Sequence, residues 1–297
     1  MKAAPATVSL VLGSGGARGL AHIGVIRELE ARGYAIRAVS GSSMGALVGG
    51  IYGMGRLDTY TEWVTALEQT DVLRLLDWTL AAGGLIRGRR IIDQLRELIG
   101  DCDIEDLPID FTAVTVDLDR GRELWLNRGP LFDAVRASIA IPGIFTPHEY
   151  RDRTLVDGGI LNPVPVAPTL STVTDLTVVV DANAGSIDPP PPETRPADKA
   201  TNSGRLGAIR EFIGSATGER ESMATQPGLS AVLTRSLETM QAAITRQHLA
   251  VFRPDVVINI PKNACMVHEF HRAAPMIELG RRLAAETLDS DNPARHD

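Results

Sequence analysis

The sequence Val8-Ser-Leu-Val-Leu12 is a short, nearly continuous apolar run that ends in glycine. Such a run is typical of a strand buried on both faces, as in a parallel sheet. The glycine-rich stretch Gly13–Gly19 follows as a loop. From Leu20 apolar residues recur at helical spacing up to Gly33, which fits a C-terminal helix cap. This order of strand, loop and helix indicates the first half of a β-α-β unit.

A second strand is expected over Ile36–Val39. It leads into the pentapeptide Gly41-Ser-Ser-Met-Gly45 and then into a small-residue segment of helical character, Ala46–Gly55. Later patterns predict strands near residues 111–117, 123–126, 154–156, 176–181 and 256–260, and helices near residues 57–67, 88–99, 131–139, 230–249 and 275–287. This alternation predicts an α/β fold with a parallel sheet and right-handed connections.

The bulk composition restricts the class of protein. With 297 residues, of which 44% are hydrophobic, the chain is long enough to bury a sizeable core, and because only 4% are aromatic that core is mainly aliphatic. The net charge of -7 argues against nucleic acid as a partner and against broad electrostatic binding to anionic membranes. One basic run, Arg87–Arg90, is either an anion site or a solvated helix start.

No segment predicts a membrane span or an export signal. No apolar run approaches the roughly 18 residues that a membrane-spanning helix needs, and glycines interrupt the first apolar stretch too early for a signal peptide. Cys102 and Cys265 lie far apart without metal-type spacing, so we expect a reducing compartment and no disulfide framework. These features predict a cytoplasmic protein, with peripheral contact to lipid as an open alternative.

The pentapeptide around Ser43 fits the G-x-S-x-G pattern of a nucleophilic serine. Gly41 and Gly45 leave room for a strained turn between strand and helix, and the helix N-terminus behind the serine favours a developing oxyanion. The pattern alone is weak evidence, because short Gly and Ser patterns arise by chance. The apolar strand before it and the small-residue segment after it strengthen the prediction that Ser43 is a nucleophile.

The glycine loop offers backbone N–H groups that can cradle negative charge. A dinucleotide site fits poorly, because G-x-G-x-x-G counted from Gly13 ends at Arg18 and no suitable acid ends the second strand. An oxyanion hole fits better, since this loop and the Ser43 turn lie in one β-α-β unit, with Gly15 and Gly16 as the donors. Arg18 either orders the loop, binds nearby carbonyl groups or meets a lipid phosphate.

The serine needs a base, and histidine is the usual one. Histidines stand at positions 22, 148, 248, 268, 271 and 296. His248, His268 and His271 have the right order in the chain, but none follows a strand in a glycine-framed loop. Asp157 does, because it follows Thr-Leu-Val and precedes Gly158. An aspartate that only caps its own turn is an equally compatible interpretation.

Four ordered blocks of the sequence together resemble patatin-like phospholipases. The blocks are residues 12–24 at the glycine loop, residues 41–45 around the serine, residues 138–145, and residues 156–165 around the aspartate. The nearest branch resembles bacterial proteins similar to the catalytic domain of neuropathy target esterase. The likeness runs from about Val8 to Asp181 and resumes from Ser230 into the terminal helix.

The resemblance implies a three-layer α/β sandwich with a mainly parallel central sheet. It also implies hydrolysis of phospholipid or lysophospholipid acyl esters by a Ser–Asp dyad, Ser43 and Asp157, through an acyl-enzyme and without a metal or other cofactor. The remaining site residues implied by motif are Gly15, Gly16 and Ala17 in the oxyanion hole, Ser14, Arg18 and Gly19 in support, Gly41 and Gly45 at the serine turn, and Gly158 and Gly159 after the base. Ser14 replaces the family's usual glycine, so we expect reduced room there.

We expect one hydrolase domain over residues 1–297, with core blocks at residues 8–181 and 230–287. Residues 185–226 between them are rich in proline and polar residues and predict a flexible insertion. Within it, an apolar stripe at helical spacing fits either a short packed helix or a lid that contacts lipid; its residues are Leu206, Ile209, Phe212 and Ile213. Two rival functions stay open, a nucleotide-binding module and a non-catalytic lipid-binding protein. The sequence fixes neither the head group of the lipid nor the oligomeric state.

Overall fold

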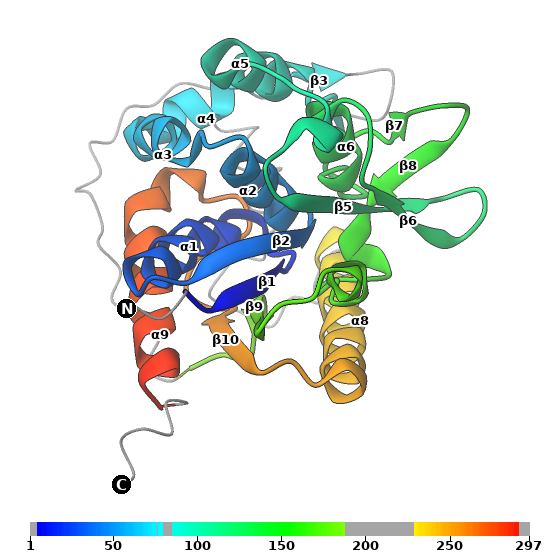
Figure 1. Ribbon diagram of the computed structural model, residues 1–297. Coiled ribbons are helices and arrows are strands. Elements are labelled where there is room, and N and C mark those ends of the chain that lie inside the picture. Colours follow the sequence, from blue (N-terminus) through cyan, green and yellow to red (C-terminus); the bar gives the residue numbers. More distant parts are fainter. Residues whose placement is uncertain (1–4, 76, 80–84, 188–228, 291–297) are drawn as a thin grey trace, which may run out of the picture.

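A central sheet of eight strands has the order β10-β9-β1-β2-β5-β8-β7, and β6 also pairs with β5 (Figure 1). The computed structural model describes residues 5–75, 77–79, 85–187 and 229–290. The strands are β1 (Thr7–Leu12), β2 (Ala35–Ser42), β5 (Asp110–Asp117), β6 (Arg122–Leu126), β7 (His148–Glu149), β8 (Thr154–Asp157), β9 (Leu176–Ala184) and β10 (Val256–Pro261). The strands from β10 to β5 are mutually parallel, which confirms the mainly parallel sheet.

Helices cover both faces of this sheet. They are α1 (Ala21–Ala31), α2 (Met44–Gly53), α3 (Leu57–Ala66), α4 (Gln69–Leu75), α5 (Arg89–Ile99), α6 (Leu131–Ser138), α8 (Leu229–Phe252) and α9 (Ala273–Ser290). Short 3-10 turns are η1 (Gly16–Leu20), η3 (Ile104–Asp106), η4 (Gly158–Ile160), η5 (Ala167–Ser171) and η6 (Phe270–Arg272). The predicted α/β fold is therefore confirmed.

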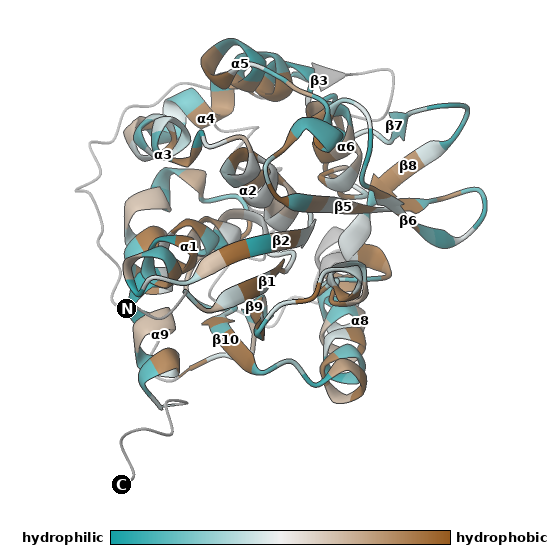
Figure 2. Cartoon of the chain, in the orientation of Figure 1, coloured by the Kyte–Doolittle hydropathy of each residue, from teal (hydrophilic) through white to brown (hydrophobic). Residues whose placement is uncertain are grey.

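Alternate residues of β1 enter two separate apolar clusters. Leu10 and Leu12 belong to the large core that also includes α1, α2 and α9, whereas Val11 packs with Val179 of β9 in a second cluster. The second cluster is completed by side chains of α8 and of the segment before η5. Because successive side chains of a strand point to opposite faces, this division defines three layers. The strands β1, β5 and β10 are accordingly largely apolar in Figure 2.

The structure differs from the sequence-based expectations in local detail. Helical structure begins inside the glycine loop, because η1 precedes α1. The periodicity does not predict α4, which buries no residue fully, or the two-residue strands β3 (Trp78–Thr79) and β4 (Leu85–Ile86). β6, β7 and β8 run antiparallel to their neighbours, a direction that apolar runs alone do not reveal.

The basic run at residues 87–90 opens α5. The carboxylate of Asp77 accepts the backbone N–H of Gly88 at 2.6 Å and that of Arg89 at 3.0 Å. A helix N-terminus attracts anions, and here an internal carboxylate occupies it. The geometry therefore favours the helix-start interpretation of this run over an external anion site.

Two further expectations concern membrane-spanning helices and the insertion at residues 185–226. Among the described helices, none is both long enough and apolar enough to span a bilayer. The predicted insertion over residues 185–226 falls mostly outside the described residues, which contain only its first residues, 185–187. Its apolar positions from Leu206 onward, and the choice between a packed helix and a lid, thus stay predictions.

Candidate active site

Two strands, β2 and β8, lie end to end along one edge of β5, and Ser43 and Asp157 stand where they meet. β2 runs parallel to β5 and pairs Ser42 with Val114. β8 runs antiparallel and pairs Asp157 with the next residue of β5, Thr115. β6 takes the other edge of β5 at both positions. The carboxyl ends of β2 and β8 therefore meet head to head, which brings Ser43, the residue after β2, next to Asp157.

The turn at Ser43 is strained in the way a nucleophilic elbow requires. Ser43 has φ 56° and ψ -122°, a conformation that a residue with a side chain rarely adopts. A Cβ at Gly41 would collide with the backbone of Gly45, and a Cβ at Gly45 would collide with the carbonyl of Leu12. Both glycines are thus required by close backbone contact, as the G-x-S-x-G pattern predicts.

A hydroxyl from α6 holds the serine turn on its other side. Ser138 Oγ accepts the backbone N–H of Ser43 at 2.9 Å and donates to the carbonyl of Val114 at 2.6 Å. Because Val114 is also the partner of Ser42 in the sheet, the turn is anchored to β5 twice. The position of Ser43 is therefore set by rigid elements rather than by a free loop.

Asp157 is an almost fully buried carboxylate. Ser43 and Asp157 are only 2% and 3% exposed. Oδ1 of Asp157 accepts the N–H of Gly159 at 2.7 Å. Burial raises the pKa of Asp157 to about 6, while hydrogen bonding from the nearby Ser43 hydroxyl and from Gly159 opposes the shift. Oδ2 has no partner of standard hydrogen-bond geometry among the described residues, so it is the oxygen with spare capacity to accept a proton.

The glycine loop packs directly against both of these turns. A Cβ at Gly159 would lie 2.9 Å from Cβ of Ser14, and a Cβ at Gly19 would lie 2.5 Å from Cβ of Met44. Ser14 and Gly19 belong to the loop, whereas Gly159 follows the aspartate and Met44 follows the serine. Three segments that are distant in sequence thus converge at one edge of the sheet.

Most backbone donors of the loop are already used. Three N–H groups bind carbonyl groups of neighbouring segments at 2.9 Å, in the pairs Gly13 to Val180, Ser14 to Pro163 and Ala17 to Val267. The N–H groups of Gly15 and Gly16 have no partner among the described residues. Of the three predicted oxyanion donors, Gly15 and Gly16 are therefore available and Ala17 is occupied. The N–H of Ser14 is occupied as well.

Two side chains fix the peptide planes that carry these free donors. Arg18 Nε donates to the carbonyl of Gly15 at 3.2 Å, and Asn183 Nδ2 donates to the carbonyl of Ser14 at 3.0 Å. In a trans peptide the C=O and N–H point in opposite directions. Arg18 therefore orients the N–H of Gly16, and Asn183 orients the N–H of Gly15. Arg18 also donates to Asn183 Oδ1 at 2.6 Å, which links the two supports.

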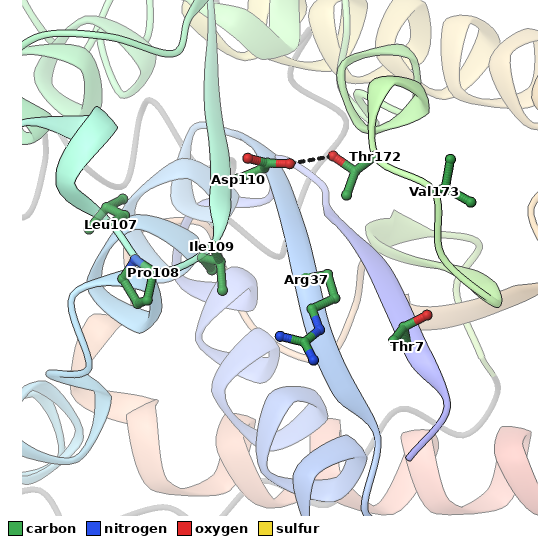
Figure 3. A pocket seen from close by; sticks show the side chains of 8 residues that line it. All are labelled: Thr7, Arg37, Leu107, Pro108, Ile109, Asp110, Thr172 and Val173. Atoms are coloured by element: carbon green, nitrogen blue, oxygen red, sulfur yellow. Dashed lines mark hydrogen bonds between the residues drawn. The ribbon is translucent and has the colours of Figure 1, made fainter. Parts of the chain in front are cut away.

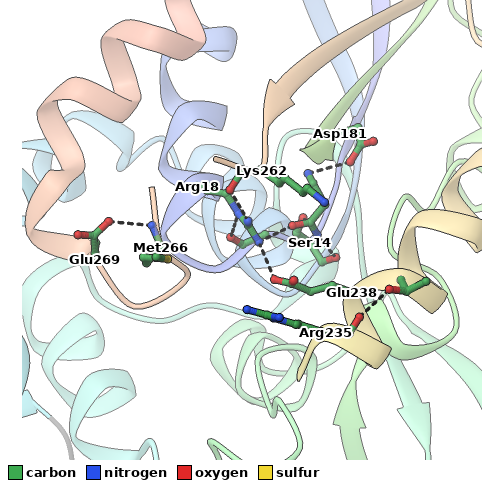
Figure 4. Close-up of polar contacts among 11 residues, drawn as sticks. Ser14, Arg18, Asp181, Arg235, Glu238, Lys262, Met266 and Glu269 are labelled. Carbon is green, nitrogen blue, oxygen red and sulfur yellow. Dashed lines mark hydrogen bonds and ion pairs between the residues drawn. The ribbon is translucent and has the colours of Figure 1, made fainter. Parts of the chain in front are cut away.

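Arg18 is buried and satisfied by the protein itself. It donates to the carbonyl of Lys262 at 2.8 Å and lies 3.7 Å from the carboxylate of Glu238 in α8 (Figure 4). Burial lowers the pKa of Arg18, and Glu238 opposes this shift. Of the open alternatives for Arg18, ordering the loop and binding carbonyl groups are the ones observed.

α8 contacts the site at several points. Gln241 Nε2 donates to the carbonyl of Gly159 at 3.0 Å. His248 Nδ1 lies 3.1 Å from Oδ1 of Asn162, the residue whose carbonyl accepts the hydroxyl of Ser42 at 2.7 Å. These bonds hold α8 across the turn that follows Asp157.

The histidines near the site have other partners. His22 Nε2 is 2.8 Å from the carbonyl of Gly13, which can only accept, so this nitrogen carries the proton. Complete burial lowers the pKa of His22 to about 4, so its ring is neutral at physiological pH.

Within the described residues no group of His, Cys, Asp or Glu side chains is arranged to hold a metal ion.

Several side chains that shape the site are not apparent from sequence patterns. Asn183, Glu238 and Gln241 reach the glycine loop and the aspartate turn only through tertiary packing. Ser138 had a signal, because it begins the block at residues 138–145 that contributes to the family resemblance. Asn183 follows the predicted strand at residues 176–181 closely, and the carboxyl end of a parallel strand is where site residues collect.

The chain matches one family model and is similar to several known proteins. The family model described as patatin-like phospholipase matches residues 10–170. An uncharacterized NTE family protein of Mycobacterium tuberculosis is 40% identical over 95% of this chain and 91% of its own length. A lysophospholipase of Emericella nidulans is 31% identical over 63% of this chain but only 12% of its own length. Among solved structures, VipD of Legionella pneumophila aligns with 97% of this chain and 67% of its own, at TM-score 0.44 and 14% identity.

Proposed function

Because the chain belongs to the patatin-like phospholipase family, we propose that it hydrolyses acyl esters of phospholipids or lysophospholipids, with Ser43 as nucleophile and Asp157 as its base. The observation that carries this proposal is the head-to-head meeting of β2 and β8 on β5. It brings a strained serine beside a buried carboxylate. The lysophospholipase among the relatives supports a lipid ester as the substrate.

In the first half of the proposed reaction, Oδ2 of Asp157 takes the proton of the Ser43 hydroxyl while Oγ bonds to the ester carbonyl carbon. The N–H groups of Gly15 and Gly16 stabilise the oxyanion, and removing one such donor costs about 3–4 kcal/mol in a comparable site. The ester C–O bond then breaks, Asp157 returns its proton to the leaving alcohol, and an acyl-Ser43 remains.

In the second half, Asp157 takes a proton from water as the water oxygen attacks the acyl-Ser43 carbonyl. The Ser43 C–O bond breaks, the proton passes to Ser43 Oγ, and the fatty acid leaves. An aspartate with its usual pKa is a weak base. Burial raises the pKa of Asp157 to about 6, which improves its basicity while leaving it mostly ionised at neutral pH.

Labelling with a fluorophosphonate followed by peptide mapping tests the nucleophile. We expect modification of Ser43 in the native chain and its loss in Ser43→Ala. A panel of phospholipids and lysophospholipids with different head groups then tests the substrate class. An unlabelled Ser43 together with no release of fatty acid from any lipid would leave the chain as a non-catalytic member of its family.

A further inference from the structure

α8 buries one side against the site and exposes apolar and basic residues on its outward side. Gln241, Thr245 and His248 lie on the inward side, where they are buried or half-buried. Among the α8 side chains whose burial the structure describes, the exposed large apolar ones are Val232, Leu233, Met240 and Val251. Leu233, Met240 and Val251, which are 61%, 56% and 73% exposed, are spaced so that they follow one line along the helix. Figure 2 shows apolar and polar residues on this same helix.

The charged residues of α8 divide by sign, with the acid turned inward and the arginines exposed. Between Val232 and Val251 its charged residues are Arg235, Glu238 and Arg246. Glu238, the single acid among them, pairs inward with Arg18. Arg235 and Arg246 are exposed and have no ion pair among the described residues. The exposed part of α8 therefore carries the apolar line on one flank and two arginines on the other, roughly 120–160° around the helix, in a chain whose net charge is -7.

We propose that the outer side of α8, residues 232–251, docks on the surface of an anionic phospholipid bilayer. An interfacial helix buries its apolar side chains at the head-group boundary while its arginines attract anionic lipids. The chain's net charge of -7 does not oppose this docking, because salt screens distant charges and the attraction to anionic lipid depends on the residues within about a Debye length of it. The inference rests on the proposed function for its biological sense, since the substrate of that reaction lies in such a surface.

Continuity with the proposed site supports this assignment. The helix that carries the apolar line also bonds to Gly159 through Gln241 and meets Arg18 through Glu238. Docking through its outer side would therefore hold the buried Ser43 and Asp157 close to the lipid. Other strongly exposed apolar residues, such as Leu170 and Val173, do not lie on a helix that contacts the site.

A second copy of the chain is a poorer occupant of this surface. Two copies packed with this side together would bring Arg235 and Arg246 near one another without an exposed acid of α8 to compensate them. Such like-charge contacts oppose association. A bilayer of anionic lipid offers both an apolar phase and the opposite charge.

Vesicles of ether-linked lipids test the inference, because they lack the acyl ester and stay intact during the measurement. We expect the native chain to float with vesicles of ether-linked phosphatidylcholine that contain ether-linked phosphatidylglycerol. We expect the double variant Leu233→Asp/Met240→Asp to lose binding about tenfold. Val173→Asp, which adds a charge at a residue that is 97% exposed elsewhere, serves as the matched control and should bind as the native chain does.

The charge component has its own variants. Arg235→Gln/Arg246→Gln should lower binding to the anionic vesicles about tenfold and leave weak binding to pure phosphatidylcholine unchanged. Arg37→Gln, which removes an exposed arginine far from α8 at the start of β2, is the control. The inference would be overturned if Arg235→Gln/Arg246→Gln bound anionic vesicles as well as the control Arg37→Gln does, or if the native chain did not bind them.

Two further readouts separate this inference from the proposed function. Hydrolysis of a soluble short-chain ester should persist in Leu233→Asp/Met240→Asp while hydrolysis of vesicle lipid falls. An inactive native chain that still binds vesicles would overturn the proposed function alone. A photo-crosslinking amino acid in place of Met240 should capture lipid, whereas capture of a second copy or of residues 188–228 would assign the surface to that occupant and overturn the inference.

Discussion

At the amino-terminal ends of the parallel strands, Arg37 and Asp110 line an open hollow of about 420 Å³, whereas Ser43 and Asp157 at the opposite ends are almost completely buried (Figure 3). Asp110 hydrogen-bonds to the hydroxyl of Thr172 at 2.6 Å and is exposed. This hollow is thus lined by well-solvated groups. Close packing removes water from the carboxylate of Asp157 and raises its pKa, so the two ends of the sheet differ in the acid–base chemistry that they can support.

The largest expected difference between these two ends of the sheet is in activity, which should be lost on substitution at the buried end and kept on substitution at the open hollow. Ser43→Ala and Asp157→Asn should each lower the hydrolysis of a soluble ester by roughly a thousandfold or more, because the proposed mechanism needs both residues in one step. Asp110→Asn at the open hollow should stay within a few-fold of the native rate. Steady-state kinetics on purified chains provide the measurement.

The dyad would be wrong if Asp157→Asn kept near-normal turnover while His248→Ala lost it. His248 is the appropriate competitor, because it lies on α8 and bonds to Asn162 beside the serine turn. Its described geometry makes it a support of that turn, so we expect His248→Ala to retain measurable turnover.

A smaller effect is expected for Asn183, which orients the N–H of Gly15, a proposed oxyanion donor. Asn183→Leu removes the bond to the carbonyl of Ser14 and should lower kcat by roughly 10–100-fold with little change in KM. The rate of fluorophosphonate labelling should fall in parallel. A change confined to KM, or to thermal stability with kcat preserved, would show that Asn183 supports the fold and not the reaction.

The dependence of the rate on pH provides a third contrast. Asp157 must be ionised to act as a base, and its pKa is raised to about 6. The value of kcat/KM on a soluble ester should therefore rise with pH, by about tenfold per unit below that pKa, and level off above it. A profile that levels off near the ordinary aspartate pKa of about 4 would contradict the desolvated environment.

The smallest effect concerns stability. A carboxyl whose folded pKa is raised stabilises the fold at pH values below its unfolded pKa and loses that contribution as pH rises through about 6. Asp157→Asn should thus increase the free energy of unfolding at pH 8 by about 1–3 kcal/mol, as measured by urea denaturation. At pH 4 the difference should nearly vanish.

Asp117 provides the opposite case within the same sheet. It forms ion pairs with Arg120 at 2.9 Å and with Arg153 at 3.3 Å, and the hydrogen bond from Arg120 lowers the pKa of Asp117. Its contribution is present above the unfolded pKa and is lost as pH falls. Asp117→Asn should therefore reduce stability at pH 8, and stabilisation by both substitutions would contradict the electrostatic explanation.

Sequence patterns predict the framework of the molecule well. The apolar runs at Val8–Leu12 and Ile36–Val39 lie within β1 and β2, and Gly33 adopts φ 82° after α1, as its cap position predicts. Such features follow from local periodicity and from the freedom of glycine. The G-x-S-x-G turn belongs to the same class, because its strain is encoded by adjacent residues.

The rest of the site depends on pairing between distant segments. The antiparallel direction of β8, and hence the meeting of Asp157 with Ser43, is set by its register on β5. Likewise, the sequence neighbours of Ala17 do not indicate that its N–H donates to the carbonyl of Val267. Nor do those of Ser14 indicate that its carbonyl accepts a hydrogen bond from Asn183. Local sequence provides no information on such contacts, since they connect residues far apart in the chain.

The register of β2 and β8 on a shared strand has a consequence for divergence within the family. The separation of Ser43 from Asp157 is fixed by two successive residues of β5, Val114 and Thr115, and not by the length of the chain that connects them. Insertions or deletions in the hairpins and helices between these strands can therefore change the surroundings of the proposed site while Ser43 and Asp157 keep their spacing. If the proposed dyad is correct, the range of substrates can change during evolution without a change in the chemistry.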